Sequence, residues 1–312
     1  MKKINKQIDV YFSETYKSKL TDVPLSEQEL GLNDFIQNLE IPRLSNEEQA
    51  TFEHELTVQE IKYVLHSFEK ITTPGEDGFS KEFYGTFFDL LKQNLLDSYN
   101  EAFQKGSLSV SQRKGVIFLI PKNDCDLSEL TGWRQMTLLN VHYKILAKCI
   151  AKRIELFLPK LIYSDQTGFM KDRFIGQNVR LLKKISGIFL FIEFGKAFDS
   201  TEWNFIKRSL ELFNLGPFLT RWFSILYNNS EAAVMNAGYM TYYFTVSRGV
   251  RQGCPLSPFL FTLSVELLAL KTRQEPNCKS IRLPNLQEAK ISQFADDTTL
   301  ISKDTNSLKF SL

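Results

Sequence analysis

Two adjacent acids, Asp296 and Asp297, lie between apolar, β-prone segments near the end of this chain. Ile291 and Phe294 precede the pair and Leu300 follows it, while aspartate tolerates the backbone angles of a tight turn. The stretch therefore predicts a β-hairpin with two carboxylates at its tip. Neighbouring carboxylates repel each other, and a divalent cation is the obvious group to offset that repulsion. A solvated Asp-Asp turn would give the same local pattern, because aspartate is a common turn residue.

The composition limits the class of protein. The 312 residues are 43% hydrophobic and 13% aromatic, which is ample for a packed globular core. The 38 basic and 36 acidic residues leave a net charge of +2. This balance excludes a uniformly basic nucleic-acid binder, so any such site must be a local surface. The four cysteines form no Cys-x-x-Cys pair, and neither a zinc site nor a disulfide framework is predicted.

Helices are predicted where apolar residues recur at helical spacing, over residues 57–68, 79–106, 141–158, 203–213 and 257–270. The first opens with a capping box of Thr57 and Glu60, and Asp199 with Glu202 predicts another before residues 203–213. The helix at 141–158 carries a basic face, predicted to lie mostly outward, made of Lys144, Lys148, Lys152 and Arg153. That face could contact phosphates or could simply be solvated. Residues 1–50 predict a helix and then a loop-rich lead-in, without a readable function.

Short apolar runs predict strands at residues 115–121 and 187–192. The first run delivers Lys122 to the end of its strand. The second is the best candidate for a strand covered on both faces, because it is a continuous run of large apolar residues, and it ends at Glu193. In the loop that follows Arg248, Gly249 and Gly253 predict a close approach of two backbone segments.

Several motifs together resemble a known family. Phe294-Ala295-Asp296-Asp297 resembles the signature of reverse transcriptases, and residues 248–258, Arg-Gly-Val-Arg-Gln-Gly-Cys-Pro-Leu-Ser-Pro, resemble the non-LTR, LINE-type retrotransposon branch. Further matches precede these in the order of the family: Pro74-Gly75-Glu76-Asp77-Gly78, Leu119-Ile120-Pro121-Lys122, Trp133-Arg134, Leu138-Leu139-Asn140, Tyr143-Lys144-Ile145, Asp165-Gln166-Thr167-Gly168-Phe169 and Lys196-Ala197-Phe198-Asp199. The resemblance covers residues 56–303.

This resemblance implies an α+β fold, a right-hand polymerase core of fingers and palm with an antiparallel palm sheet packed on helices. It divides the chain into an N-terminal lead-in segment at 1–55, a fingers-like part at 56–182 and a palm at 183–312, with the thumb missing. The implied function is that of the RNA-directed DNA polymerase (reverse transcriptase) domain of a LINE-type retrotransposon. Such a domain extends a primer by two-metal nucleotidyl transfer onto its 3′ hydroxyl.

The resemblance also implies a site, residue by residue. Glu193, Asp296 and Asp297 are expected to be catalytic and, with the carbonyl of Phe194, to hold two Mg²⁺ ions, for which Mn²⁺ could substitute. The residues expected to bind the nucleotide are Lys122, Arg134, Ala197, Phe198, Gln252 and Gly253. Of these, Lys122 and Arg134 suit a triphosphate, and Phe198 is the expected steric gate against a ribose 2′ hydroxyl. Simple core packing remains the alternative for Phe198.

The expected partners are an RNA template, a DNA primer, their RNA/DNA hybrid and deoxynucleoside triphosphates. The first 20 residues lack the apolar stretch of a signal peptide, and no run of about eighteen apolar residues occurs. A soluble, intracellular protein is therefore expected, without a membrane partner, and the resemblance implies the nucleus or the cytoplasm. The oligomeric state stays open.

The chain departs from the family pattern in several places. Glu193 stands where the family almost always has Asp, and Asp172 stands where it usually has Gly. Gln135-Met136 replaces Pro-Ile, and the stretch between Val179 and Gly187 is short. Glu193, Asp172, the short segment and the missing thumb favour an alternative, a catalytically impaired copy that at most binds RNA or hybrid. A two-metal nuclease is a second alternative, because it also needs clustered acids.

Overall fold

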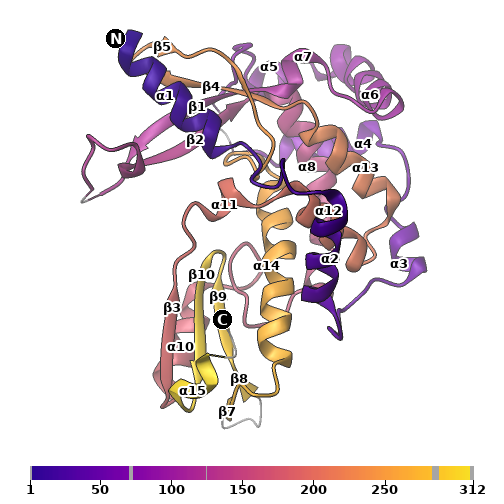
Figure 1. Ribbon diagram of the computed structural model, residues 1–312. Coiled ribbons are helices and arrows are strands. Elements are labelled where there is room, and N and C mark those ends of the chain that lie inside the picture. The colour runs from indigo at the N-terminus through magenta and orange to yellow at the C-terminus, as the bar shows by residue number, and fades with distance from the viewer. Residues whose placement is uncertain (1, 70–72, 124, 283–287, 310–312) are drawn as a thin grey trace.

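The computed structural model describes residues 2–69, 73–123, 125–282 and 288–309, and its strands form two main sheets (Figure 1). The five-stranded sheet has the order β2 (Trp133–Leu139), β1 (Lys114–Pro121), β4 (Glu231–Asn236), β5 (Tyr239–Met240), with β6 (Phe244–Thr245) also paired to β4. Strand β1 is antiparallel to β2 and parallel to β4. The three-stranded sheet is antiparallel, in the order β3 (Ile188–Ile192), β10 (Asp297–Ser302), β9 (Ile291–Phe294). A two-stranded pair, β7 (Ile281–Arg282) and β8 (Glu288–Ala289), lies nearby.

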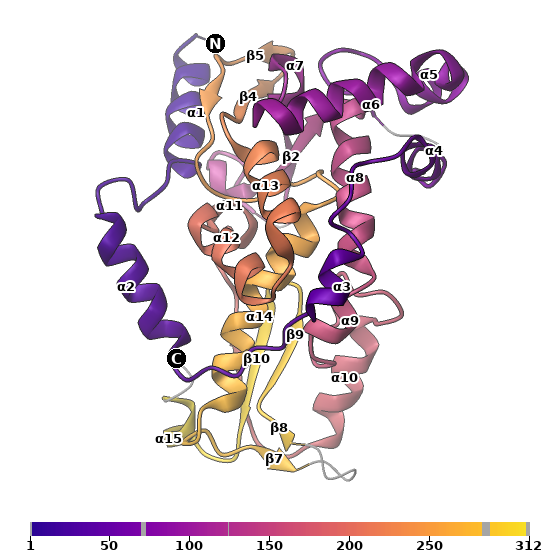
Figure 2. The same cartoon turned by 90° about the vertical axis from the view of Figure 1, so that its right-hand side faces the viewer.

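Helix α14 (Ser257–Gln274) runs through the centre of the molecule. Twelve of its 18 residues are buried, as expected for a helix that is apolar on all sides. It packs against α8 (Val141–Glu155), α12 (Trp203–Leu212) and strand β9. Figure 2 shows α14 beside α8, and apolar residues of both helices and of α13 (Gly216–Tyr227) belong to the main core. The helix predicted at 257–270 is therefore confirmed, and it extends to residue 274.

The remaining helices are α1 (Lys2–Thr15), α2 (Leu25–Ile36), α3 (Asn46–Ala50), α4 (Val58–His66), α5 (Lys81–Thr86), α6 (Phe88–Lys105), α7 (Val110–Arg113), α9 (Leu158–Leu161), α10 (Ile175–Lys184), α11 (Ala197–Ser200) and α15 (Thr305–Leu308). The predicted capping box opens α4, where Thr57 Oγ1 accepts from the Glu60 amide at 3.2 Å. The helix predicted over 79–106 is two helices that meet at Phe87, the second ending at Gly106 in the left-handed conformation. No helix among the described residues is both long and apolar enough to cross a membrane.

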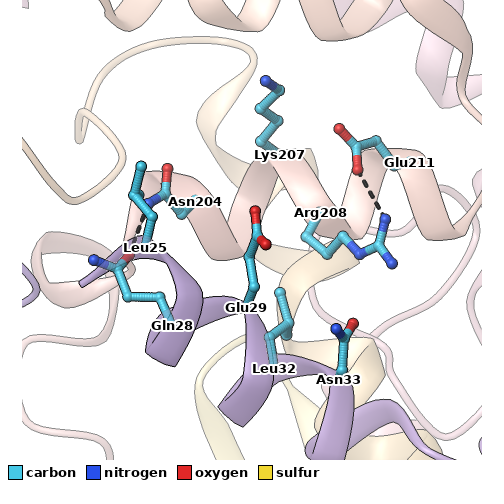
Figure 3. A pocket seen from close by; sticks show the side chains of 9 residues that line it. All are labelled: Leu25, Gln28, Glu29, Leu32, Asn33, Asn204, Lys207, Arg208 and Glu211. Carbon is cyan, nitrogen blue, oxygen red and sulfur yellow. Dashed lines mark hydrogen bonds and ion pairs between the residues drawn. The ribbon is translucent and has the colours of Figure 1, made fainter. Parts of the chain in front are cut away.

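The N-terminal segment contains more helix than predicted. Helix α1 was expected, and its Ile8 and Phe12 pack on Ile117 and Val234 of the five-stranded sheet. The expected loop-rich lead-in contains α2 and α3 instead. Helix α2 buries none of its residues, and a hollow of about 390 Å³ lies between it and α12, beside a hydrogen bond from Asn204 to Gln28 (Figure 3). Acidic and basic side chains line this hollow together, so it has no dominant charge: Glu29, Glu211, Lys207 and Arg208.

Strand β3 forms where it was predicted, but it is not covered on both faces. It lies at the edge of its sheet, and Phe191 is 71% exposed. Ile188, Leu190 and Ile192 pack on the cluster around Ala269 of α14, while on the opposite face Phe189 packs on the cluster around Ile281. The prediction was therefore wrong in part, because the length of an apolar run does not show whether the second face of a strand is covered along its whole length.

The prediction that the basic residues of α8 lie mostly outward was also partly wrong. Lys144 and Arg153 are buried, each 7% exposed. The Lys144 ammonium donates to the Thr73 carbonyl at 3.0 Å, and the Arg153 guanidinium pairs with Glu60 at 2.7 Å. Carbonyls at the ends of neighbouring segments and an acid on α4 draw these cations inward, so they serve the core rather than a phosphate surface.

Candidate active site

One cleft of about 960 Å³ collects segments that are far apart in the sequence. The end of the β1–β2 hairpin, the loop from β3 to α11, the start of α14 and the β9–β10 turn all contribute to it. Its lining includes every residue predicted to bind metal or nucleotide except Asp297: Lys122, Arg134, Glu193, Phe194, Ala197, Phe198, Gln252, Gly253 and Asp296. The cleft is also lined by residues for which no metal- or nucleotide-binding role was predicted, namely Leu130, Thr131, Trp133, Gln135, Phe169, Gly195, Lys196, Asp199, Arg251, Cys254, Ser257 and Pro258.

The predicted hairpin is present, with Asp296 in the turn. Phe294 pairs with Asp297, which leaves Ala295 and Asp296 as the two linking residues. Ala295 has φ 57°, in the left-handed region that an L-residue enters at a cost of roughly 1–2 kcal/mol. This backbone must be held in place by its surroundings.

Gln166 holds the backbone of the β9–β10 turn in place. Its side chain is fully buried, and its Oε1 accepts from the amides of Ala295 and Gly168, both at 2.9 Å. Its Nε2 donates to the Ala295 carbonyl at 3.2 Å. Gly168 lies so close that a Cβ there would be 2.1 Å from the Ala295 nitrogen. The loop of residues 165–168 therefore clamps the turn that carries Asp296.

The acids of the site influence one another electrostatically. Burial raises the pKa of Asp296, and the charges of Asp297 and Glu193 raise it further, against a backbone hydrogen bond that lowers it. Glu193 follows β3 and is exposed, and Asp297 is exposed at the start of β10. Within the described residues, no group of three or more Asp, Glu, His or Cys side chains is arranged to hold a metal ion.

The predicted cations reach the same cleft from the five-stranded sheet. Lys122 directly follows β1, and Arg134 lies in β2 opposite Ile120. Both side chains are exposed, and in the described part of the chain neither has an ion-pair or hydrogen-bond partner for its charged group. These cations therefore remain available to an anionic ligand.

Phe198 both lines the cleft and packs on its floor. Its ring stacks on Phe261 of α14 with centroids 4.3 Å apart, and it meets Phe169 edge-on at 5.9 Å. The two alternatives for this residue, a cleft wall and core packing, are thus not exclusive. A ring supported from behind by α14 presents a rigid edge to whatever enters the cleft.

The loop before α14 makes the close backbone approaches that its glycines predicted. The Val250 amide donates to the Phe198 carbonyl at 2.7 Å, and the Thr137 amide donates to the Gln252 carbonyl at 2.8 Å. A Cβ at Gly249 would lie 2.6 Å from the Asp199 carbonyl oxygen. This loop therefore joins helix α11 to strand β2 and closes one side of the cleft.

Asp199 does not cap a helix as predicted. It lies inside the short helix α11, is 3% exposed, and accepts hydrogen bonds from Tyr16 and Gln252. Helix α12 instead begins after Glu202, without a side-chain cap. The extra turn of α11 carries Asp199 inward, which the spacing of the two acids does not reveal.

Asp172, one of the departures from the family pattern, has φ 62°. A glycine adopts this left-handed conformation freely, and aspartate is among the few other residues that tolerate it. The substitution is therefore compatible with the backbone at this position.

An ion-pair network links the loop of residues 165–168 to helix α14. The Arg273 guanidinium of α14 donates to Asp165 Oδ2 at 2.8 Å and to Glu266 Oε1 at 2.7 Å. Glu266 is fully buried. Burial raises its pKa to about 7, although Arg273 opposes the shift. Two carboxylates share one guanidinium here, so the network carries one excess negative charge when both are ionised.

We expect this network to make stability depend on pH. The native Glu266 carboxyl binds its proton more tightly than the unfolded one, whose pKa is near 4.5. Its contribution to stability is therefore fully present below that value and is lost as pH rises through about 7. The Tm of the parent minus that of Glu266→Gln should be larger at about pH 5 than at about pH 8, measured by thermal unfolding. The exposed Glu27→Gln is the matched control, and an equal difference at both pH values would contradict the assignment.

Comparison with known proteins agrees with the family that the motifs indicate. The family model described as reverse transcriptase (RNA-dependent DNA polymerase) matches residues 120–312. The 149 kDa protein of transposon TX1 from Xenopus laevis is 31% identical over 273 residues, covering 85% of this chain and 21% of that protein. The Pol polyprotein of the R2 element from Popillia japonica is 27% identical over 197 residues, covering 59% of this chain and 26% of that protein.

A second R2 Pol polyprotein, from Nasonia vitripennis, is 24% identical over 252 residues, covering 78% of this chain and 24% of that protein. The chain thus spans about a fifth to a quarter of the length of these relatives. The match to the family covers more than half of the chain, and it includes the hairpin of acids and the loop before α14. The chain belongs to the reverse transcriptase family, as a reverse transcriptase domain of the LINE-type, non-LTR retrotransposon group.

Proposed function

We propose that this domain catalyses RNA-directed DNA synthesis, transferring a deoxynucleotide to the 3′ hydroxyl of a primer paired with an RNA template. One observation carries the proposal. Two free cations, an aromatic wall, a glutamine and two acids from separate segments line a single cleft: Lys122, Arg134, Phe198, Gln252, Glu193 and Asp296. Nucleotidyl transfer needs this combination, because the protein must bind a triphosphate and also hold the charge that develops on it.

The proposed division into fingers and palm is not a division between the two sheets, because the five-stranded sheet contains strands from both ranges. The three-stranded antiparallel sheet, packed on α14, is the proposed palm within residues 183–312. The β1–β2 hairpin belongs to the proposed fingers at 56–182. Strand β4, from the palm range, pairs with β1, and β5 and β6 each pair with β4. The lead-in at 1–55 is fixed to both parts, because α1 packs on the five-stranded sheet and α2 lies beside α12.

The donor set fits Mg²⁺ in its chemistry. Carboxylates of Glu193, Asp296 and Asp297 and the carbonyl of Phe194 are hard oxygen ligands, and the pKa of Asp296 is raised by burial and by its acidic neighbours rather than lowered by a cation of the protein. Two Mg²⁺ ions bound by these residues would activate the primer hydroxyl and neutralise the triphosphate. Mn²⁺ has similar ligand preferences and is the proposed substitute.

The chain's own residues bind and orient the nucleotide in this proposal. Lys122 offers a point charge and Arg134 a forked donor to the triphosphate. Phe198, backed by α14, excludes a ribose 2′ hydroxyl, while Ala197 supplies the adjoining wall. Gln252 and Gly253 line the opposite side. The hybrid of RNA template and DNA primer would be held through its backbone shape, as A-form duplexes are.

Primer extension tests the proposal. The purified chain, an RNA template with an annealed DNA primer and Mg²⁺ should extend the primer with deoxynucleotides far more than with ribonucleotides, and EDTA should abolish extension. A parallel reaction without nucleotides separates a nuclease, which would shorten the labelled strands. Shortening without extension would overturn the proposal.

Among the departures that favour an impaired copy, the one that lies in the cleft and would affect metal binding is the longer carboxylate of Glu193, directly after β3. In that case the chain binds the hybrid but does not extend it in Mg²⁺ or Mn²⁺. A filter-binding assay on the same hybrid distinguishes this outcome from a protein that binds no nucleic acid. Binding by phosphate contacts should weaken with salt, with a log-log slope of roughly 0.7–0.9 for each phosphate contacted.

A further inference from the structure

Tyr16 lies at the end of the N-terminal helix α1 and is buried behind the wall of the cleft. Its hydroxyl is 3.0 Å from Asp199 Oδ1 and 2.6 Å from Gln135 Oε1. The hydroxyl carries one hydrogen, so it donates to one of these oxygens at a time. Both acceptor residues line the cleft. A residue of the N-terminal segment therefore touches the site from behind.

Asp199 continues this contact to Gln252. The Gln252 Nε2 donates to Asp199 Oδ1 at 3.2 Å and to Oδ2 at 3.3 Å. Burial raises the pKa of Asp199, and the hydrogen bonds from Tyr16 and Gln252 act in the opposite direction. Each donor thus helps to stabilise a carboxyl that has been removed from water. In return, the carboxyl restricts the rotamer of the Gln252 amide.

The end of α1 is anchored to two loops, the one that precedes α14 and the one that precedes α11. Arg248 Nε donates to the Thr15 carbonyl at 2.9 Å, and the Ser247 amide donates to the Tyr16 carbonyl at 2.9 Å. From the loop before α11, Lys196 Nζ donates to Thr15 Oγ1 at 3.0 Å. The backbone of Tyr16 is therefore fixed relative to both Asp199 and Gln252, as a support for a binding group must be.

We propose that Tyr16 is a positioning residue for nucleotide binding, which orients the Asp199 carboxyl so that it holds the Gln252 amide in place for the incoming nucleotide. This role rests on the proposed function, because Gln252 meets a nucleotide only there. Tyr16 stands behind Asp199 and acts through it. It also lies outside residues 120–312, to which the family model matches, so the site extends into a segment that the match does not reach.

Tyr16→Phe removes the hydroxyl alone and tests this role in the full chain. On an RNA template with a DNA primer and Mg²⁺, the KM for the deoxynucleotide should rise about tenfold, because a buried carboxyl loses a donor and releases its hold on Gln252. The kcat and the Kd for primer–template should stay within about twofold, since neither depends on this amide. Tyr63→Phe, on the exposed face of α4, is the matched control.

A second comparison separates positioning from a general effect on folding. In a Gln252→Ala background, Tyr16→Phe should change the KM by less than about twofold, because the group through which it acts is gone. The same factor in both backgrounds would overturn the proposal. An unchanged KM in the single variant would also overturn it.

Hydrogen exchange keeps the proposal testable if the chain extends no primer, which would refute the proposed function alone. The amides of Gly249 and Val250 donate to the carbonyls of Thr201 and Phe198. In Tyr16→Phe these two amides should exchange at least about threefold faster, while the amide of Ile61 in α4 stays unchanged. Equal exchange at Gly249 and Val250 in variant and parent would show that Tyr16 does not position this loop.

Discussion

Gly168→Ala is expected to abolish most nucleotide incorporation while leaving the bulk of the fold intact. The new Cβ would lie 2.1 Å from the Ala295 nitrogen and 2.8 Å from its Cα. Both atoms belong to the backbone, so no side chain can rotate away, and either the loop or the hairpin must move. The Gln166 clamp on Ala295 would open, and Asp296 would shift with the turn. A displacement of about 1 Å at a reacting group costs on the order of 10²-fold in rate.

Two measurements check this expectation. Single-turnover primer extension should fall by about 10²-fold, and urea unfolding should show a loss of about 1–3 kcal/mol, as for other overpacked sites. Gly31→Ala is the matched control, because a Cβ at Gly31 in α2 meets nothing within 4 Å and should be neutral or slightly stabilising. Incorporation by Gly168→Ala within about twofold of the parent would show that the hairpin tolerates movement.

Elements with a signal inside a few residues were predictable from the sequence. The hairpin of acids, the capping box at Thr57 and the apolar helix α14 all formed where their patterns placed them. Turn preference, a cap three residues from its partner and a helix that is apolar all round are local properties. They therefore do not depend on knowing which segment packs against which.

The mistaken predictions share a tertiary cause. The apolar run of β3 was expected to be covered on both faces, yet Phe191, on the face opposite to the one that packs on α14, is 71% exposed. Lys144 and Arg153 were expected to lie mostly outward, yet the core offers them carbonyls and an acid. The coverage of a strand's faces and the partners of a buried cation depend on distant segments. The periodicity within one element therefore cannot predict them.

In the candidate site, too, the residues of local motifs were predicted and the residues that support them over long sequence distances were not. Residues that belong to motifs, such as Lys122 and Gln252, were placed by resemblance and they line one cleft. The residues that hold them were missed. Gln166 contacts Ala295 across 129 positions of the chain, and Tyr16 contacts Asp199 across 183. Gln166 at least lies within a motif, but a single tyrosine in an N-terminal helix carries no pattern that points to a cleft.

Glu193→Asp is expected to raise incorporation above that of the parent. Glu193 stands where the family almost always has Asp, and its carboxylate is one methylene farther from the backbone at the end of β3. Mg²⁺ requires near-ideal octahedral geometry, so a ligand misplaced by about 1 Å lowers the rate by on the order of 10²-fold. Restoring the shorter side chain should recover up to that factor in single-turnover extension on an RNA template.

A comparison of Mn²⁺ with Mg²⁺ makes this test more specific. Mn²⁺ accepts the same oxygen ligands with less strict geometry, so the ratio of variant to parent should be smaller in Mn²⁺ than in Mg²⁺. Asp296→Ala should reduce both proteins to background, and Glu27→Asp, in the first turn of α2 away from the cleft, should leave the parent rate unchanged. If extension is measurable and Glu193→Asp leaves it equal or lower in Mg²⁺, then the longer carboxylate is a competent ligand, and the departure from the family pattern does not impair this domain.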